Sequence, residues 1–267
     1  MAVSIPDTVL EEKESPRDRT VKAGLIARAC AIYGVDLIEV YRDPKGHGDA
    51  KTICRVLQYL ETPQYLRRRI YPLDETLRFA GMLPPLRIPS HKPRVPFSSV
   101  VTGEVREGVA NSDGTVDIGL EKAPMLLGRV PPGTRVTVRI KSVEPPLAEA
   151  IRREDAGEYW GYRVETIQTE EVFEDSRYQV KVATSKLGNG LPEALGRFRT
   201  VLAGADSVKL VFGSPTRGLF DIFGPRLAHK ADLVLNLFPE QKVVTVRTEE
   251  AIFAGLGLVA LISAEKA

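Results

Sequence analysis

The chain has 267 residues, of which 43% are hydrophobic and 27% charged, and its formal net charge is +2. These values are ordinary for a soluble globular protein and do not describe a polycation. The longest apolar stretch, residues 251–263, is shorter than the roughly 18 residues that a membrane-spanning helix needs, so no membrane partner is expected.

The N-terminal part of the chain alternates predicted strands with predicted helices. Residues 2–6 and 36–41 have strand composition, and an apolar stripe behind the cap Ser15 predicts a helix that ends at Gly34. A second helix is expected over residues 49–60. This order is typical of a parallel sheet flanked by helices, so an α/β domain is predicted. The start of the chain is unlike a signal peptide, and a cytoplasmic location is expected.

Residues 65–94 are basic and rich in proline, which indicates an extended linker. Aromatic residues lie between the cations, and a basic stretch with aromatics is typical of nucleic-acid binding. A solvated surface face would have the same composition, so both interpretations stay open. The candidate RNA contacts in this stretch are Arg67, Arg68, Arg69, Lys92 and Arg94.

Residues 97–166 contain several short predicted strands joined by regular turns, which favours a small β-barrel. Residues 115–120 and 134–140 alternate apolar and polar positions, and residues 159–167 would form the last strand. The block resembles an OB-type barrel and, in the fragment Gly114-Thr115-Val116-Asp117-Ile118-Gly119, an S1-like RNA-binding module.

Three aromatic residues near the end of this block are available to stack on RNA bases. They are Tyr159, Trp160 and Tyr162. A place in the barrel core is the alternative for each of them.

Strands and helices alternate again after about residue 178. Thr248 is expected to cap an apolar final helix. The predicted strands before it cover residues 179–183, 208–212, 232–235 and 242–246. A β-barrel therefore interrupts one α/β domain. The predicted domains are residues 1–92 and 168–267, as the two parts of the α/β domain, and residues 93–167 as the inserted barrel.

Loops with small residues, glycine and proline follow three of these strands, at residues 184–188, 212–218 and 235–241. The carboxyl ends of strands are where open α/β sheets bind cofactors, so the loops predict one composite pocket. Walker, Gly-x-Gly-x-x-Gly and nucleophile-elbow motifs are absent from the sequence, and its cysteines and histidines fit no metal site. Backbone amides with apolar walls suit a neutral adenine and a zwitterionic methionine tail better than a polyphosphate.

Several fragments together resemble a known class of enzymes. Gly213-Ser214, the trio Asn236, Pro239 and Gln241, and the run Val246 to Ala251 are similar to the C-terminal signature of SPOUT-class RNA methyltransferases. Residues 25–36 resemble the N-terminal signature of one archaeal-eukaryotic family of that class, in which a barrel is inserted into the catalytic domain. The likeness covers nearly the whole chain.

The resemblance implies an α/β fold with a deep C-terminal trefoil knot, S-adenosylmethionine bound in the knot, and a homodimer. The implied cofactor contacts come from three segments and the last helix. They are Thr184, Ser185, Lys186 and Gly188; Gly213, Ser214, Arg217 and Gly218; and Leu235, Asn236, Leu237, Phe238, Gln241, Val244, Val246, Arg247, Thr248 and Ala251. Simpler roles remain for some of them: an ion pair for Arg247, loop hydrogen bonds for Asn236, and capping for Thr248.

The substrate side has two candidate residues, Arg19 and Arg28, because RNA phosphates require fixed guanidinium groups. Both could instead pair with the acidic residues that precede them. No side chain stands out as a general base.

The predicted function is an S-adenosylmethionine-dependent RNA methyltransferase acting on a base of ribosomal RNA, with N3 of uridine as the expected atom. A non-catalytic RNA-binding or ribosome-assembly factor that uses the barrel and the basic linker is the alternative. A metabolic α/β enzyme for a small substrate is a third possibility. The three hypotheses differ in the binding of the methyl donor and of RNA.

Overall fold

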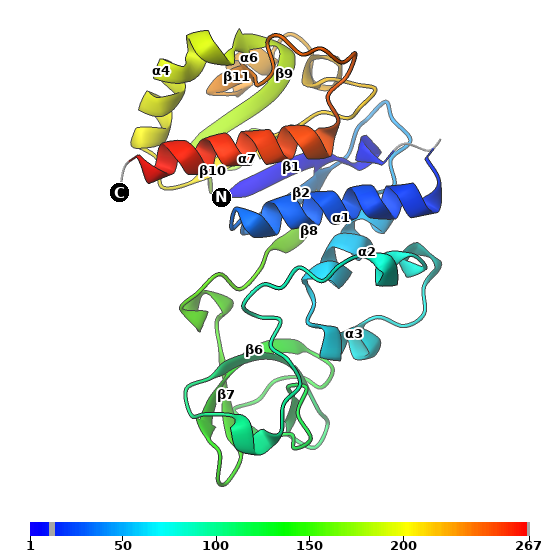
Figure 1. Ribbon diagram of the computed structural model, residues 1–267, viewed down its shortest axis with the longest axis vertical. Coiled ribbons are helices and arrows are strands. Elements are labelled where there is room, and N and C mark those ends of the chain that lie inside the picture. Colours follow the sequence, from blue (N-terminus) through cyan, green and yellow to red (C-terminus); the bar gives the residue numbers. More distant parts are fainter. Residues whose placement is uncertain (11–13, 266–267) are drawn as a thin grey trace. The chain divides into compact units, whose positions relative to one another are not determined.

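The computed structural model describes residues 1–10 and 14–265 (Figure 1). The chain divides into two compact units that are interleaved in sequence. The first unit comprises residues 1–58, 75–84 and 162–267, and the second comprises residues 59–74 and 85–161.

The first unit is built on a six-stranded sheet with the order β11-β9-β10-β1-β2-β8, and all neighbouring strands are parallel. Parallel strands are covered on both faces, and β1 and β2 are accordingly buried along their whole length. The strands are β1 (Ala2–Pro6), β2 (Leu37–Tyr41), β8 (Arg163–Ile167), β9 (Val180–Gly190), β10 (Val208–Val211) and β11 (Leu233–Asn236).

Helices α1 and α7 lie side by side against this sheet in Figure 1. Helix α1 begins where Ser15 caps it, since the Asp18 amide donates to the Ser15 hydroxyl at 3.1 Å. A cluster around Tyr41, Leu219 and Leu227 packs the short helices α5 and α6 on the sheet. The helices of this unit are α1 (Pro16–Ile32), α4 (Leu191–Ala203), α5 (Leu219–Phe223), α6 (Leu227–Lys230) and α7 (Thr248–Ala264), together with most of α2 (Ala50–Glu61).

A buried ion pair crosses the middle of the same sheet. Lys209 on β10 and Glu39 on β2 are fully buried, and their charged atoms lie 2.8 Å apart. Lys209 also reaches Asp175 at 3.0 Å, while the Ser4 hydroxyl donates to Glu39 at 2.6 Å. Buried charges are tolerated only when they are paired and hydrogen-bonded, so this arrangement holds the segment around Asp175 on the sheet.

The second unit is a curled half-barrel of five strands with the order β4-β3-β6-β7-β5. Val138 and Ile140, two residues apart on β6, point into its core, as a period of two requires. The other strands contribute Ala110, Val116, Leu126 and Ala148. The strands are β3 (Val105–Ala110), β4 (Val116–Asp117), β5 (Met125–Leu127), β6 (Arg135–Ser142) and β7 (Leu147–Ile151). Helix α3 (Gln64–Ile70) belongs to this unit as well.

The prediction of an α/β sheet with an inserted β-structure is confirmed, but one predicted strand is wrong and another belongs to a different sheet than expected. Residues 242–246 form no strand, because no neighbouring strand pairs with them and Val244 is 94% exposed. Of residues 159–167, expected as the last barrel strand, residues 163–167 form β8 and pair with β2. Alternation indicates that a segment is a strand but cannot tell which sheet it joins.

Two further differences concern the connecting segments. Residues 184–188 are part of β9, which continues to Gly190 and pairs with β11 through a shift in register after Val234. The basic stretch expected as extended linker holds helix α3. That helix is a single short element, and so few residues carry little periodic signal.

Candidate functional site

A cavity of about 220 Å³ lies at the carboxyl ends of β9, β10 and β11. Its walls come from residues 184–187, from the segment after β10, and from the segment between β11 and α7. The first turn of α7 supplies Thr248 and Ala251. Three stretches that are far apart in the sequence therefore form one hollow at the sheet edge where open α/β folds bind ligands.

Hydrogen bonds between the three segments hold the cavity together. The Asn236 side-chain amide donates to the Lys186 carbonyl at 3.0 Å, and the Asn236 Oδ1 accepts the Phe238 amide at 3.0 Å. The Thr248 hydroxyl donates to the Gly213 carbonyl at 3.1 Å. Each segment is thus fixed by a polar side chain from another segment or from its own turn, which pre-organises the walls.

The segment after β10 forms a tight turn. The Ser214 amide donates to the Arg217 carbonyl at 2.9 Å, and the Arg217 amide donates back to the Ser214 hydroxyl at 3.0 Å. A Cβ atom on Gly213 would lie 2.9 Å from the Arg217 carbonyl oxygen. Only glycine fits at this position, because the backbone of the turn folds back against it.

The cavity lining is mostly apolar side chains and backbone. Val244, Val246, Leu237 and Phe238 present carbon to the space. The Gln241 side-chain amide donates to the carbonyls of Val243 and Val244, at 2.9 and 3.1 Å, and so shapes this rim. Lys186 and Asp221 are the charged residues of the lining. The cavity suits a ligand with a flat apolar part and a few polar or ionic groups.

Fourteen of the residues predicted to bind a cofactor line this cavity. They are Thr184, Ser185, Lys186, Gly213, Ser214, Gly218, Asn236, Leu237, Phe238, Gln241, Val244, Val246, Thr248 and Ala251. The predicted residues that do not line it are Gly188, Arg217, Leu235 and Arg247.

Each of those four residues has another role in the structure. A Cβ on Gly188 would lie 2.6 Å from the Val234 carbonyl oxygen, so that glycine permits the close pairing of β9 with β11. Leu235 is buried in the core. The Arg217 guanidinium pairs with Asp43, and the Arg247 amide donates to the Glu250 carboxylate at 2.9 Å at the start of α7.

Seven lining residues were not predicted: Leu187, Phe212, Pro215, Thr216, Phe220, Asp221 and Thr245. Most of them lie inside the three segments that the sequence identifies, so naming whole segments would have found them. Phe220 and Asp221 come from α5, a helix too short for its periodicity to be recognised.

The two predicted substrate arginines lie on α1 and do not line the cavity. Arg19 forms an ion pair with Asp49, with 2.6 Å between the charged atoms. Arg28 is exposed. The two residues are about two and a half helical turns apart, so they lie on opposite sides of α1 and do not form one site within a single chain.

Three of the five predicted RNA contacts in the second unit make internal bonds. Arg67 donates to the carbonyls of Leu60 and Thr62. Arg69 pairs with Asp117 at 3.2 Å, and Lys92 lies 3.7 Å from Glu158. The side chains of Arg68 and Arg94 are exposed.

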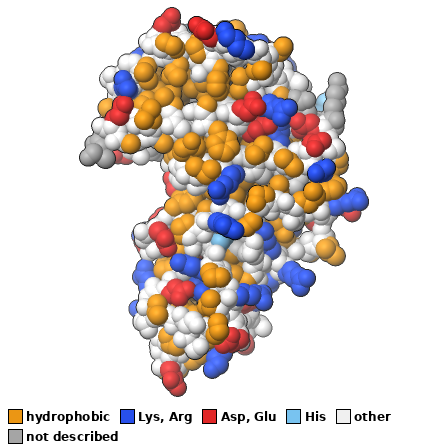
Figure 2. Space-filling view, in the orientation of Figure 1, with side chains coloured by type: hydrophobic (Ala, Val, Ile, Leu, Met, Phe, Trp, Pro, Cys, Tyr) orange, Lys and Arg blue, Asp and Glu red, His pale blue; other side chains and the backbone are white. Residues whose placement is uncertain are grey.

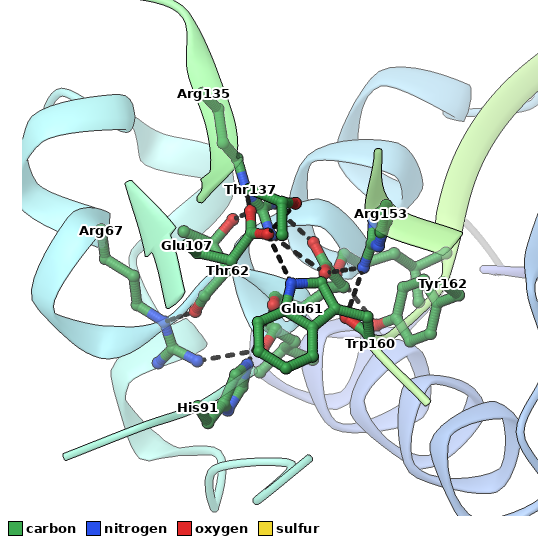
Figure 3. A network of polar contacts seen from close by, with 12 residues as sticks. Glu61, Thr62, Arg67, His91, Glu107, Arg135, Thr137, Arg153, Trp160 and Tyr162 are labelled. Atoms are coloured by element: carbon green, nitrogen blue, oxygen red, sulfur yellow. Dashed lines mark hydrogen bonds and ion pairs between the residues drawn. The ribbon is translucent and has the colours of Figure 1, made fainter. Parts of the chain in front are cut away.

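Trp160 belongs to a buried polar network in the second unit (Figure 3). Its indole N–H donates to Glu107 at 2.6 Å, and Glu107 pairs with Arg135 at 2.6 Å. Arg135 in turn pairs with Glu61 at 2.7 Å. Burial raises the pKa of Glu107, but Arg135 and the hydrogen bonds from Thr137 and Trp160 outweigh it and hold that pKa below its ordinary value.

The aromatic residues of this region are thereby accounted for in different ways. Trp160 is 3% exposed, and its role is structural, as the core alternative expected. Tyr162 is buried in the first unit, where its hydroxyl donates to the Leu57 carbonyl at 3.0 Å. Tyr159 is half-buried.

Two kinds of feature are absent from the described residues. Among residues 1–10 and 14–265, no group of three His, Cys, Asp or Glu side chains is placed to hold a metal ion. In the same ranges no helix has both the length and the apolar character that a membrane span needs.

The sequence is similar to that of several known proteins along nearly its whole length. A family model described as "Putative RNA methyltransferase" matches residues 1–259. A human protein named 28S rRNA (uridine-N(3))-methyltransferase is 34% identical over 297 residues, which cover 96% of this chain and 76% of that protein. The mouse protein of the same name is 32% identical, with 96% of this chain and 74% of that protein covered. An uncharacterized protein of Halobacterium salinarum is 33% identical, with 97% and 98% covered.

Proposed function

The chain belongs to this RNA methyltransferase family, and we propose that it transfers a methyl group from S-adenosylmethionine to a base of ribosomal RNA. The observation that carries the proposal is the cavity at the ends of β9, β10 and β11. Its walls combine the three segments to which the SPOUT resemblance assigns the methyl donor.

The residues of the cavity fit the chemistry of S-adenosylmethionine. Val244 and Val246 offer apolar surface for an adenine ring, and the exposed Val244 side chain would be covered by it. Backbone groups of residues 184–187 and 236–238 can bond the polar edge of the base and the ribose. Lys186 suits the carboxylate of the methionine tail, and Asp221 suits its ammonium group.

When bound, the donor supplies an electrophilic methyl group on a positively charged sulfur. The residues of this chain bind and orient it and exclude water from the reacting atoms. N3 of uridine is the proposed acceptor, since the human and mouse relatives are named for that atom. That nitrogen must lose its proton before it can attack, and a nearby guanidinium would favour its ionised form.

Arg19 and Arg28 are the proposed contacts to RNA on the substrate side, one on each side of α1. Arg19 is held in place by Asp49, so its guanidinium is pre-organised. Arg28 lies on the same exposed side of α1 as Val21, Leu25 and Ile32. A second copy of the chain that covered this side would bring Arg28 into the interface between copies.

We propose a homodimer that uses this face of α1 together with α7. Leu25 and Ile32 on α1 are 43% and 51% exposed, and Leu261 on α7 is 59% exposed. Figure 2 shows hydrophobic side chains spread over the face on which these two helices lie. Apolar side chains clustered on an exposed face favour association.

A trefoil knot in the C-terminal part is also proposed, as the SPOUT resemblance implies. Strand β11 pairs with β9 rather than with its predecessor β10, and the segment after it returns to the loop at Gly213 through Thr248. That order supports a threaded path. A crystal structure whose chain runs around the β10–α5 loop without passing through it would contradict the knot.

The half-barrel is proposed as an OB-like module that holds RNA, within the predicted domain of residues 93–167. Of the predicted contacts, the exposed Arg68 and Arg94 have the stronger support, because Arg67, Arg69 and Lys92 already have internal partners. The cytoplasmic location expected from the sequence stays a prediction.

Calorimetry with S-adenosylmethionine tests the donor site directly. The protein is expected to bind it with a micromolar dissociation constant, of the order usual for enzyme ligands. Thr248→Val should weaken binding about fivefold, because the change removes one hydrogen bond that fixes the cavity. Thr200→Val is the matched control, since the Thr200 hydroxyl also donates to a backbone carbonyl but does so on α4.

The substrate is tested by mass spectrometry of ribosomal RNA from cells that lack the gene. Loss of one N3-methyluridine is the expected result, and restoration by the unchanged gene but not by a Thr248→Val, Asn236→Ala double variant would tie it to the cavity. Folded protein that produces no heat with S-adenosylmethionine, or ribosomal RNA whose methylation is unchanged, would rule the proposal out.

A further inference from the structure

The loop between β2 and α2, residues 42–49, lies at the same edge of the sheet as the cavity. We propose that this loop contacts RNA phosphates and holds the nucleotides that flank the target base. The inference rests on the proposed function, since it assigns a further substrate contact to the same reaction. None of the loop residues belongs to the RNA contacts predicted from the sequence.

The loop is built on two buried aspartates, Asp43 of the loop and Asp7 after β1. Asp43 is 1% exposed, and its amide donates to the Asp7 carboxylate at 2.9 Å. The Asp43 carboxylate accepts the Lys45 amide at 3.1 Å and pairs with Arg217. The Asp49 amide donates to the Asp7 carbonyl at 3.0 Å. Both ends of the loop are thereby fixed to the end of β1.

Two glycines bring the loop backbone against this base. A Cβ on Gly46 would lie 2.3 Å from the Thr8 methyl group, and one on Gly48 would lie 2.0 Å from the Asp7 carboxyl carbon. No side chain fits between the loop and the residues that follow β1 at either position. The loop backbone therefore packs closely against Asp7 and Thr8.

The cationic side chains of the loop, Arg42 and Lys45, are exposed, whereas Asp43 is paired with Arg217 and Asp49 with Arg19. In the part of the chain that the structure describes, neither Arg42 nor Lys45 forms an ion pair. Each carboxylate of the loop is thus paired with an arginine from elsewhere in the fold, and the side chains of Arg42 and Lys45 are exposed, which is the arrangement that a polyanion requires.

The loop is also joined to the turn that forms one wall of the cavity. The Tyr41 hydroxyl, at the end of β2, donates to the Phe212 carbonyl at 2.6 Å, and Asp43 pairs with Arg217 in the same turn. In the sheet, β2 is two strands from β10, or about 10 Å at the usual strand spacing. Nucleotides beside a base held in the cavity would reach the loop at that distance.

Fluorescence anisotropy with a labelled single-stranded RNA that contains uridine tests the proposal on the full chain. The double variant Arg42→Glu, Lys45→Glu should bind this RNA at least tenfold more weakly, since two charge-assisted hydrogen bonds to phosphate are removed. The slope of log affinity against log salt should fall by about one for each phosphate that the protein no longer neutralises. Calorimetry with S-adenosylmethionine should give the wild-type affinity for the same variant.

Lys230→Glu is the matched control. It reverses the charge of an exposed lysine in the same unit, but Lys230 precedes β11 and so lies at the opposite edge of the parallel sheet. RNA affinity equal to wild type in the double variant, or a reduction equal to that of the control, would overturn the inference. So would simultaneous loss of donor binding, which would mean that the variant disturbs the cavity itself.

The donor measurement separates this inference from the proposed function. Wild-type protein that binds the RNA but not S-adenosylmethionine would refute the methyltransferase proposal, and the loop would still be judged by the effect of the double variant on RNA affinity. If the wild-type protein binds the donor and the double variant has the RNA affinity of the wild type, only the proposed role of the loop is refuted.

Discussion

At the scale of the residue, the cavity depends on positions that have no room for a Cβ atom, and Gly213 is the clearest case. Its backbone lies so close to the Arg217 carbonyl that a methyl group in place of hydrogen would have to displace the turn. That turn carries Ser214 and Gly218, both of which line the cavity. Glycine is required at this position because there is no room for a Cβ atom, and not because of its backbone angles.

Gly213→Ala is therefore expected to lower the affinity for S-adenosylmethionine at least tenfold, as overpacking of a tight turn costs about 1–3 kcal/mol. Calorimetry measures the change. Gly196→Ala is the control, because a Cβ at Gly196 meets nothing within 4 Å. That change replaces glycine inside α4 and should stabilise the protein by about 0.5–1 kcal/mol while leaving donor binding unchanged. Wild-type affinity in Gly213→Ala would show that the turn adapts.

At the scale of elements, the second unit places a histidine between helix α3 and the half-barrel network. The His91 Nε2 atom lies 2.9 Å from the Glu61 carbonyl oxygen, and Glu61 pairs with Arg135 and Arg153. Burial lowers the pKa of His91 to about 4, although the hydrogen bond with Glu61 opposes the shift. The imidazole is neutral in the folded protein at pH 7.

A depressed histidine pKa gives a definite pH dependence. Between about pH 6.5 and pH 4 the unfolded chain binds a proton at His91 that the folded protein does not, so stability falls as the pH falls. The free energy of unfolding should drop by at most about 1.4 kcal/mol per pH unit in that window. Urea denaturation at several pH values measures it.

His91→Gln should flatten this dependence between pH 6.5 and pH 4, because glutamine has no proton to gain. His229→Gln, at an exposed histidine on α6, is the matched control and should follow the wild-type curve. A wild-type free energy of unfolding that stays constant through the window would contradict the assignment.

At the scale of the whole molecule, the exposed face of α1 and α7 determines the proposed oligomeric state. Leu25→Lys should convert the proposed dimer to a monomer in analytical ultracentrifugation, because a buried charge at an apolar interface is strongly unfavourable. Leu73→Lys changes another leucine, one that is fully exposed and lies outside both helices, and should leave the mass unchanged. A monomeric wild-type protein would refute the dimer.

Local signals in the sequence were enough to predict much of the fold. The cap at Ser15, the start of α7 at Thr248 and the buried strands β1 and β2 all follow from composition and period, which depend on neighbouring residues only. The loops after the C-terminal strands were recognisable from their small residues and from the resemblance to SPOUT methyltransferases. Their convergence followed from the parallel order of the sheet.

The tertiary structure alone decided which side chains face the cavity and which have other partners. Arg217 turns to Asp43, Gly188 lies against β11, and Trp160 bonds Glu107. It also decided that β8 joins the large sheet and that residues 242–246 remain unpaired. The physical reason is common to all of these: each depends on a partner far away in the sequence, and no pattern of neighbouring residues encodes the position of that partner.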